Sequence, residues 1–429
     1  MRIALSILML FAVAVAAALL AGNNQGTVTL YWPPYRLDLS LNLALLLLVA
    51  GFVVLHLALR ALAALFAMPG QARRWRLQHK ERAMHLALLD ALSHLFAGRF
   101  IRARKSAELV LVQEEALERG GDALPYAGRL RALAHLLAAE SAHSLLAKDV
   151  REGHFQQAMS QSAQRDAHET REGVQLRAAN WAMDDRDAQA ALRWLDELPQ
   201  GVSRRTVALR LRLKAARLAG QVPVALETAR LLAKHRAFSQ AAGQSIVRGL
   251  TLELIDTTLD RARLLKVWAE LDSQERQDPD IAIRASQRLL ALGGEAALSR
   301  AWLLPLWEQM LKGPGALEVS RRVKLVETLQ TGFTLAEGEP DAAWLTRIES
   351  AQMRNPGDPL YLYLAGVTCM HLQLWGKAQQ LLKQSLPQLR NDALEHTAWC
   401  ALAELAEQRG DAAGATEAYR NAVRGGGKR

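Results

Sequence analysis

The sequence predicts an all-α protein, in which an N-terminal two-helix transmembrane hairpin is followed by an α-solenoid of repeated helix pairs. Two long apolar runs lie within the first 68 residues, and a cluster of basic residues follows the second run. In the rest of the chain, strong helix formers such as Ala, Leu, Arg, Glu and Gln dominate, and a short packing motif recurs. Together these observations indicate a helical array held at a membrane.

The first apolar run spans residues 3–21, with Ser6 as its one polar interruption. At ~1.5 Å per residue, such a helix is roughly as long as the hydrocarbon core of a bilayer is thick. The run therefore predicts a first transmembrane span. A cleaved secretory signal is the alternative, because a basic residue precedes the run, but no clean small-residue cleavage site ends it.

The second apolar run carries one polar residue, His56, and predicts a second span at about residues 41–60. These two spans and the loop between them, residues 22–40, form the predicted hairpin of residues 1–68. We expect the second helix to break at Met68-Pro69-Gly70, because proline and glycine disfavour helix interiors. A basic juxtamembrane segment then covers residues 69–83. Its predicted membrane-surface residues are Arg73, Arg74, Trp75, Arg76, Lys80 and Arg82.

The distribution of charge sets the expected orientation. Residues 1–82 carry eight Lys/Arg and two Asp/Glu, so +6 of the formal net charge of +10 lies there. Basic residues precede the first span and follow the second, whereas the loop holds only Arg36, opposed by Asp38. The positive-inside rule therefore places both termini in the cytoplasm and the loop outside. The pattern fits contact with anionic lipid and argues against a nucleic-acid partner, which would need basic charge concentrated in the helical domain.

The outer loop contains β-branched and aromatic residues at 27–32 and 35–39, on either side of Pro33-Pro34. This pattern predicts a short, weak β-hairpin. Its aromatic residues, Tyr31, Trp32 and Tyr35, have two interpretations: they anchor the loop at the headgroup level, or they bind a protein partner. We favour anchoring.

The soluble part repeats a turn motif, in which a small residue is followed two positions later by a bulky residue and five positions later by Ala. Copies begin at Gly98, Gly153 and Gly220. The fullest copy has Trp399, Leu402, Ala403, Gly410, Ala415, Tyr419 and Ala422, and the copy before it has Leu362, Gly366, Trp375, Ala378 and Leu382. These offsets match the tetratricopeptide repeat (TPR), in which small residues let paired helices approach closely.

We therefore predict a TPR-like α-solenoid over residues 84–424 and a disordered tail over residues 425–429. The motif alanines Ala191 and Ala225 lie 34 residues apart, which is the period of the repeat. A generic helical bundle is the alternative. The repeats are least clear between residues 238 and 343, where we expect irregular, heavily packed helices around Trp268, Trp302, Trp307 and Trp344.

No catalytic signature is present in the sequence. It has no dinucleotide-binding or phosphate-binding glycine loop, no His-Glu-x-x-His and no Gly-x-Ser-x-Gly. The two cysteines, Cys369 and Cys400, form no metal-binding pattern, and we expect both to be buried free thiols. We therefore predict a protein that is not an enzyme, with no metal site, no catalytic residues and no identifiable cofactor.

The order of these parts resembles the HemY-type inner-membrane TPR proteins, which are associated with haem biosynthesis in proteobacteria. The resemblance covers almost the whole chain and includes the paired spans and the last repeats. Its sequence elements are Asn24-Gln25-Gly26-Thr27-Val28, Arg73-Arg74-Trp75, the first helical pair from Leu88 to Ala107, and Asp358-Pro359-Leu360-Tyr361. Pro33-Pro34 departs from the usual loop and leaves the conformation of its turn open.

The resemblance implies a two-pass protein of the bacterial inner membrane that acts in a late step of protohaem synthesis. It implies a non-catalytic scaffold that organises haem-pathway proteins beside the lipids of the inner membrane. Haem or porphyrin is a possible ligand through this resemblance alone, since no cofactor site is identifiable in the sequence. The same name is used for an unrelated flavin-dependent protoporphyrinogen oxidase, but the missing dinucleotide fingerprint argues against that activity here. The alternatives are an envelope assembly factor of the lipopolysaccharide type, and a porphyrin-carrying or enzymatic haem-pathway protein.

One partner-binding surface can be proposed from repeat geometry. The helix expected over residues 206–218 has Leu209, Leu213 and Ala216 at packing positions. Arg210, Lys214 and Arg217 then form a basic stripe facing the concave groove, and Asn180 occupies a groove position of the preceding repeat. Arg and Lys in such a groove can hold acidic peptide ends through charge-assisted hydrogen bonds. The alternative is a solvated helix face.

Overall fold

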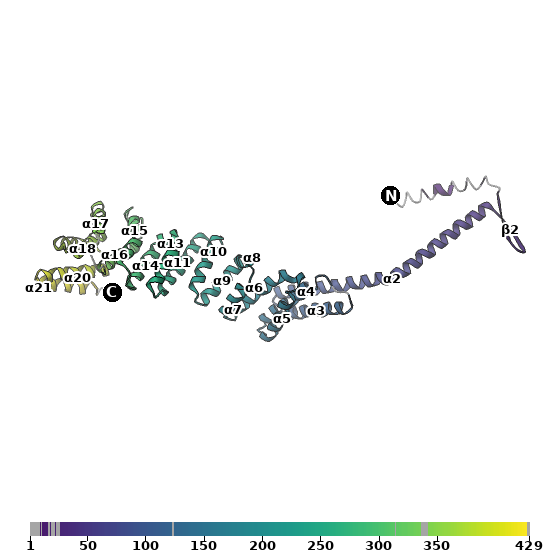
Figure 1. Ribbon diagram of the computed structural model, residues 1–429, viewed down its shortest axis with the longest axis horizontal. Helices are drawn as coiled ribbons and strands as arrows, with labels where there is room; N and C mark the ends of the chain where they lie inside the picture. The colour runs from purple at the N-terminus through teal and green to yellow at the C-terminus, as the bar shows by residue number, and fades with distance from the viewer. Residues whose placement is uncertain are drawn as a thin grey trace. The chain divides into compact units, whose positions relative to one another are not determined.

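A computed structural model describes residues 26–121, 124–313, 315–335 and 342–426, together with positions 9, 11–15, 18 and 22 (Figure 1). Side chains are described within these ranges except at residues 64–74, 342, 425 and 426. The chain is mostly helical, as predicted, and forms two compact units, residues 1–174 and 175–429. Of the predicted first span, residues 3–21, the structure describes only positions 9, 11–15 and 18, which are helical.

The outer loop forms the predicted hairpin. Strand β1 (Thr27–Trp32) pairs antiparallel with β2 (Tyr35–Ser40), and a cis peptide bond joins Pro33 to Pro34 in the turn. Every residue of β1 is β-branched, aromatic or aliphatic, and β2 has aromatic or aliphatic residues at alternate positions, which suits a pleated pair. Helix α2 follows β2 without a linker. The last strand residue, Ser40, caps the start of the helix, since its hydroxyl accepts a hydrogen bond from the Leu43 N–H at 3.3 Å.

Helix α2 (Leu41–Phe96) is one continuous helix of 56 residues. The expected break at Met68-Pro69-Gly70 is therefore wrong. A proline inside a helix costs about 3 kcal/mol, because it lacks an N–H and its ring crowds the preceding turn. Here that cost is offset by strong helix formers on both sides: Ala and Leu precede the proline, and Gln, Ala, Arg and Lys follow the glycine.

One segment of α2 is long and apolar enough to cross a membrane. Among the described residues it is the single such segment, and it runs over Leu41–Ala63 with a mean hydropathy of 2.5 and none of its apolar window buried. Its exposed leucines and valines match the second predicted span. The other half of the predicted two-helix hairpin remains a prediction.

The first unit is completed by helices that pack against the last part of α2. These are α3 (Phe100–Arg119), α4 (Ala127–Ser144), α5 (Lys148–Gln161) and the short 3₁₀ helix η1 (Arg165–Ala167). Helix α2 packs against α3 and α4, and α4 packs against α5. The core contains Met84, Ala87, Val110, Leu117, Leu130 and Ala134, and a second buried cluster contains Ala91, Ala107 and Ala138.

The second unit begins with paired helices. Helix α6 (His168–Asp184) contains the boundary between the units, and it is followed by α7 (Ala188–Asp196), α8 (Gln200–Ser203), α9 (Thr206–Leu218) and α10 (Val222–Lys234). The predicted packing positions of α9 are confirmed, since Leu209, Leu213 and Ala216 are 3%, 8% and 0% exposed. Helix α10 packs against both α9 and α11.

The middle of the second unit is irregular, as the sequence predicts. Its helices are α11 (Gln240–Thr257), α12 (Arg261–Glu270), α13 (Ser273–Gln277), α14 (Pro279–Ala291) and α15 (Ala296–Met310). Trp268 stacks on Trp302 with ring centroids 4.3 Å apart, and Trp307 meets Trp344 edge-on at 5.8 Å. These indoles fill the space between helices. In a regular pair lined by alanine, the two helices would instead pack directly against each other.

Regular pairs return towards the C-terminus. They are formed by α16 (Val319–Thr334), α17 (Ala342–Arg354), α18 (Pro359–His371), α19 (Trp375–Ser385), the 3₁₀ helix η2 (Leu386–Gln388), α20 (Asp392–Gln408) and α21 (Ala412–Gly426). The first helices of successive pairs, α16, α18 and α20, pack side by side. Gly425 and Gly426 belong to α21, and residues 427–429 of the predicted tail lie outside the described residues.

The turns between paired helices share one backbone conformation. In five of them, a residue with positive φ stands five positions before a buried alanine: Gly98 and Ala103, Arg186 and Ala191, Gly220 and Ala225, Gln373 and Ala378, Gly410 and Ala415. The motif copy placed at Gly153 is wrong in its turn, because Gly153 lies inside α5. There the left-handed residue is Leu146, with φ 58°.

The cysteines differ in their surroundings. Cys369 is fully buried in α18, as predicted, whereas the expectation that Cys400 is buried is wrong, because it is only partly covered on α20. Its Sγ lies 3.8 Å from His396 Nδ1. Both thiols are free, and burial raises the pKa of each.

Candidate functional site

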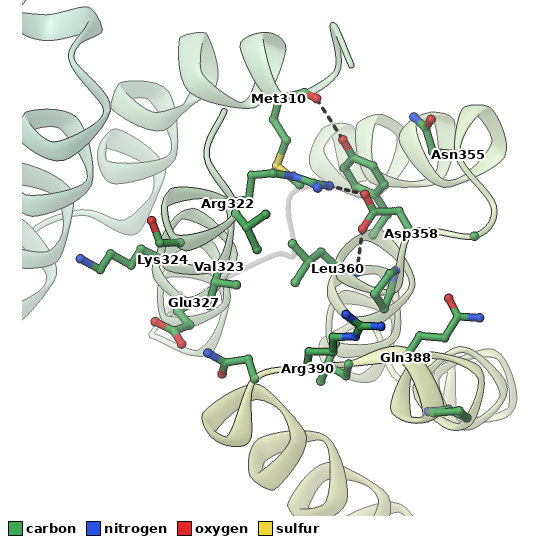
Figure 2. A pocket seen from close by; sticks show the side chains of 18 of the residues that line it. Met310, Arg322, Val323, Lys324, Glu327, Asn355, Asp358, Leu360, Gln388 and Arg390 are labelled. Atoms are coloured by element: carbon green, nitrogen blue, oxygen red, sulfur yellow. Dashed lines mark hydrogen bonds and ion pairs between the residues drawn. The ribbon is translucent and has the colours of Figure 1, made fainter. Parts of the chain in front are cut away.

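The main cavity lies where the N-terminal ends of α16, α18 and α20 come together in the second unit (Figure 2). Its volume is about 1210 Å³, which is large enough for a peptide segment or a large organic ligand. Two capping residues shape it. Asp358 accepts a hydrogen bond from the Leu360 N–H at 3.1 Å and starts α18, and Asn391 accepts one from the Leu394 N–H at 2.9 Å and starts α20.

One wall of this α16–α20 pocket is a buried ion pair. The Arg322 guanidinium of α16 donates to the Asp358 carboxylate, and the two side chains are 11% and 19% exposed. Beside them the Tyr361 hydroxyl donates to the Met310 carbonyl at 3.3 Å, and the Arg322 guanidinium lies 6.0 Å from the Tyr361 ring centroid. Arg322 Nε is buried without a hydrogen-bond partner among the described residues. A charge held in this way fixes the mutual position of α16 and α18.

The rest of the lining combines apolar and charged groups. Val323, Leu360 and Leu389 supply apolar surface. In Figure 2 the Arg390 side chain extends beneath Leu360 into the pocket, whereas Lys324 extends away from the Arg322–Asp358 pair. Partial burial raises the pKa of Glu327, and Lys324 opposes that rise. Arg390 is an exposed cation that faces the space, while Asp358 is paired to Arg322.

The chemistry of this lining suits binding of a ligand with a negative charge and an apolar part. The described lining contains no histidine or cysteine that could act as a general base or nucleophile. An exposed guanidinium beside apolar residues and three helix N-termini instead suits an acidic, partly apolar segment. The pocket was not identified from the sequence, although its Asp358-Pro359-Leu360-Tyr361 stretch was one of the elements that carried the family resemblance.

The predicted α9 stripe is present as a surface. Arg210, Lys214 and Arg217 are all exposed, and they follow one another on the side of α9 opposite its buried leucines. Arg210 donates a hydrogen bond to the Ala237 carbonyl at 2.9 Å, so part of its guanidinium is committed to the next connection. Asn180 lies partly buried on α6. None of these four residues lines the α16–α20 pocket.

The predicted membrane-surface residues all lie on α2. The side chains of Arg73 and Arg74 lie outside the described residues. Trp75 is 66% exposed and stacks on His79, with ring centroids 5.4 Å apart. Arg76, Lys80 and Arg82 are also exposed. The surface they form is therefore helical rather than the separate segment expected from the sequence.

No cluster of three or more His, Cys, Asp or Glu suited to a metal occurs within the described ranges. A pair of histidines does occur in the first unit, where His135 Nδ1 of α4 lies 3.0 Å from His154 Nδ1 of α5. Burial and the neighbouring His154 lower the pKa of His135 to about 4. Burial also lowers the pKa of His154, although Glu108, 3.8 Å from its Nε2, opposes this shift.

Comparison with known families identifies a family that the N-terminal part of the chain resembles. Residues 26–145 match the family model described as HemY protein N-terminus. Over these residues, the chain is similar to the HemY family. The match begins at the base of the hairpin and ends just after α4, so it takes in the apolar helix and the first helical pair. It confirms the resemblance stated from the sequence.

No curated protein matches the chain significantly. Similar solved structures include the Cut9–Hcn1 hetero-tetramer of APC/C, with 15% identity, TM-score 0.26, and coverage of 81% of this chain and 67% of that one. The P58(IPK) TPR domain has 16% identity, TM-score 0.22 and coverage of 81% and 99%. Naa15/Naa10 bound to HypK has 12% identity, TM-score 0.22 and coverage of 80% and 59%. At these values, no functional conclusion follows from them.

Proposed function

We propose that the protein is a membrane-anchored scaffold that acts in a late step of haem biosynthesis by gathering pathway proteins at the cytoplasmic face. The HemY family match over residues 26–145 is the observation that carries the proposal. The exposed apolar segment Leu41–Ala63 supplies the anchor. The helical pairs of the second unit supply a long surface for partners, in keeping with repeat proteins of this kind.

Partner recognition is assigned to the α16–α20 pocket. Its exposed Arg390 can donate charge-assisted hydrogen bonds to a carboxylate, while Leu360 and Leu389 accept an adjoining apolar side chain. The α9 stripe offers a second basic contact for the same class of acidic segment. The proposed partner is therefore a haem-pathway protein with an exposed acidic segment.

The full chain, purified in a mild detergent, tests the function. Co-purification of haem-pathway enzymes without a pigment band supports the scaffold. A porphyrin or haem absorption band supports the alternative of a porphyrin-carrying protein. Envelope-assembly proteins in place of haem enzymes would support the lipopolysaccharide-type alternative, and turnover of a porphyrin substrate by the pure chain would make it an enzyme.

Charge reversal tests the pocket separately. Arg390→Glu is expected to reduce partner capture at least tenfold, because it places a carboxylate where the partner's carboxylate binds. Arg420→Glu, on the exposed side of α21, is the matched control and should leave capture unchanged. Equal capture by both variants would exclude the pocket.

The α9 stripe has its own test. Reversal of Arg210, Lys214 and Arg217 to Glu should abolish capture while helicity by circular dichroism is unchanged. Capture that survives the triple reversal would show that this helix face is only solvated.

The proposed location is the bacterial inner membrane, with two spans, both termini in the cytoplasm and the loop outside. A reporter active only outside the cytoplasm should give a signal when fused after Asn24 and none when fused after Gly313. A signal from the second fusion would refute this topology.

A further inference from the structure

The β1–β2 hairpin has two chemically distinct faces. In an antiparallel pair, side chains of directly opposed residues lie on the same face, and successive pairs alternate between faces. The register pairs Val28 with Leu39, Leu30 with Leu37, and Trp32 with Tyr35, so one face is entirely apolar or aromatic. The intervening pairs, which make the other face, are Thr27 with Ser40, Thr29 with Asp38, and Tyr31 with Arg36.

Most of the apolar face is uncovered within the described part of the chain. Val28 and Leu39, near the base of the hairpin beside α2, are partly buried, whereas the rest of the face is exposed. Trp32, Tyr35 and Leu37 are 72%, 71% and 56% exposed, and Leu30 is 51% exposed. A two-stranded hairpin is marginally stable alone in water, and a hydrophobic face of this size requires cover.

The position of the hairpin limits what can provide that cover. The Leu41 N–H donates a hydrogen bond to the Gly26 carbonyl at 2.9 Å, which ties the base of the hairpin to the first residue of the apolar segment. No residue of linker separates strand β2 from that segment. The apolar face is therefore held at the boundary where the lipid-exposed helix ends, and aromatic residues such as Trp32 and Tyr35 favour that depth.

The position of the charged residues shows whether the hairpin would contact lipid through apolar or through charged groups. The two charged groups of the hairpin, Arg36 and Asp38, lie on the polar face and form an ion pair with Nε and Oδ1 3.4 Å apart. The apolar face carries no charge. Attraction to it therefore depends on burial of apolar surface and not on anionic headgroups.

We infer that the β1–β2 hairpin is an interfacial membrane-binding element, which lies on the lipid surface beyond the α2 span with Val28, Leu30, Trp32, Tyr35, Leu37 and Leu39 against lipid. Of the three loop aromatics, Trp32 and Tyr35 insert, whereas Tyr31 faces water beside Arg36. Phospholipid is thus the partner of this face, and the inference is independent of the scaffold role proposed above.

Single-cysteine labelling of adjacent residues tests this. In full-length protein carrying Cys369→Ala and Cys400→Ala, a fluorescent label is placed at Leu30→Cys on the apolar face or at Thr29→Cys on the polar face. Each protein is reconstituted in phosphatidylcholine vesicles that contain lipids with a quencher on the acyl chain, and iodide is added as a water-soluble quencher.

The label at position 30 should be quenched by lipid at least several-fold more than by iodide, and the label at position 29 should show the opposite preference. The pattern should persist when anionic lipid or 0.5 M salt is added, because the apolar face is uncharged. Equal exposure of both labels to iodide would overturn the inference. Protection of position 30 from both quenchers would also overturn it, since a second copy of the hairpin would then cover the face.

Discussion

Two buried helical glycines in the second unit allow the packing of the repeats to be tested by matched substitutions. A Cβ added to Gly366 of α18 would lie 2.8 Å from Leu382 Cγ and 3.2 Å from the Leu382 backbone N. A Cβ added to Gly332 of α16 would have Arg300 Cγ at 3.8 Å as its nearest neighbour. The space beside Gly366 is thus occupied by a neighbouring helix, whereas the space beside Gly332 can hold one methyl group.

The expected free energies of unfolding follow from two opposing terms. Replacing glycine by alanine inside a helix stabilises it by about 1 kcal/mol, because glycine loses more backbone entropy on folding. At Gly366 this gain is outweighed by overpacking, which typically costs about 1–3 kcal/mol and is at the upper end here because a branch carbon and a backbone atom must both move. We expect Gly366→Ala to lose about 1–2 kcal/mol and Gly332→Ala to gain about 0.5–1 kcal/mol.

Native-state hydrogen exchange of the full chain in mild detergent measures this locally. Amides of α18 and α19 should lose protection in Gly366→Ala, while amides of α16 should gain protection in Gly332→Ala. This readout suits a repeat array, in which one pair can open without the rest. If Gly366→Ala stabilised the protein as much as Gly332→Ala, the close approach of α18 and α19 would be refuted.

Three further outcomes are expected. The pKa of His135 is lowered from 6.5 to about 4 in the folded protein, so between these pH values the unfolded chain binds more protons than the folded chain. Its contribution to stability is therefore full above pH 6.5 and falls as the pH is lowered through this window. Urea midpoints of His135→Asn should show a shallower fall with decreasing pH. Arg322→Leu should lose about 3 kcal/mol by leaving Asp358 unpaired, and adding Asp358→Asn, which keeps the helix cap, should restore most of it; a double variant as unstable as the single one would contradict the ion-pair argument. Cys369→Ser should lose about 1–2 kcal/mol from a hydroxyl at a fully buried apolar site, whereas Cys400→Ser should change the melting temperature little and partner capture not at all.

Local periodicity explains why much of the fold could be predicted. The hairpin follows from β-branched and aromatic residues around a proline turn, and the α9 packing face follows from Leu209, Leu213 and Ala216 at repeat spacing. The turn at Arg186 was harder to predict, because the residue with positive φ there is an arginine and not a glycine. Gly153 misled for the converse reason: a glycine is tolerated inside a helix when its neighbours pack well.

The pocket could not be predicted because its residues come from connections of different lengths. Arg322, Asp358 and Arg390 are 36 and 32 residues apart in the sequence, and they meet only because α16, α18 and α20 pack side by side. No local pattern distinguishes Arg390, which faces the pocket, from any other exposed arginine. The Pro69-Gly70 error has a local origin, since the stop signal was outweighed by the helix formers around it.

The continuity of α2 has a further consequence for how the membrane segment and the first helical pair are related. Because one helix contains both Leu41–Ala63 and Met84, each added residue between them advances Met84 by about 1.5 Å and turns it by roughly 100° about the helix axis. Lengthening this stretch by seven residues preserves the angular phase almost fully, whereas adding two turns the core-facing side through more than half a revolution. The length of residues 64–83 therefore sets the rotational position of the first helical pair about the α2 axis relative to the apolar segment.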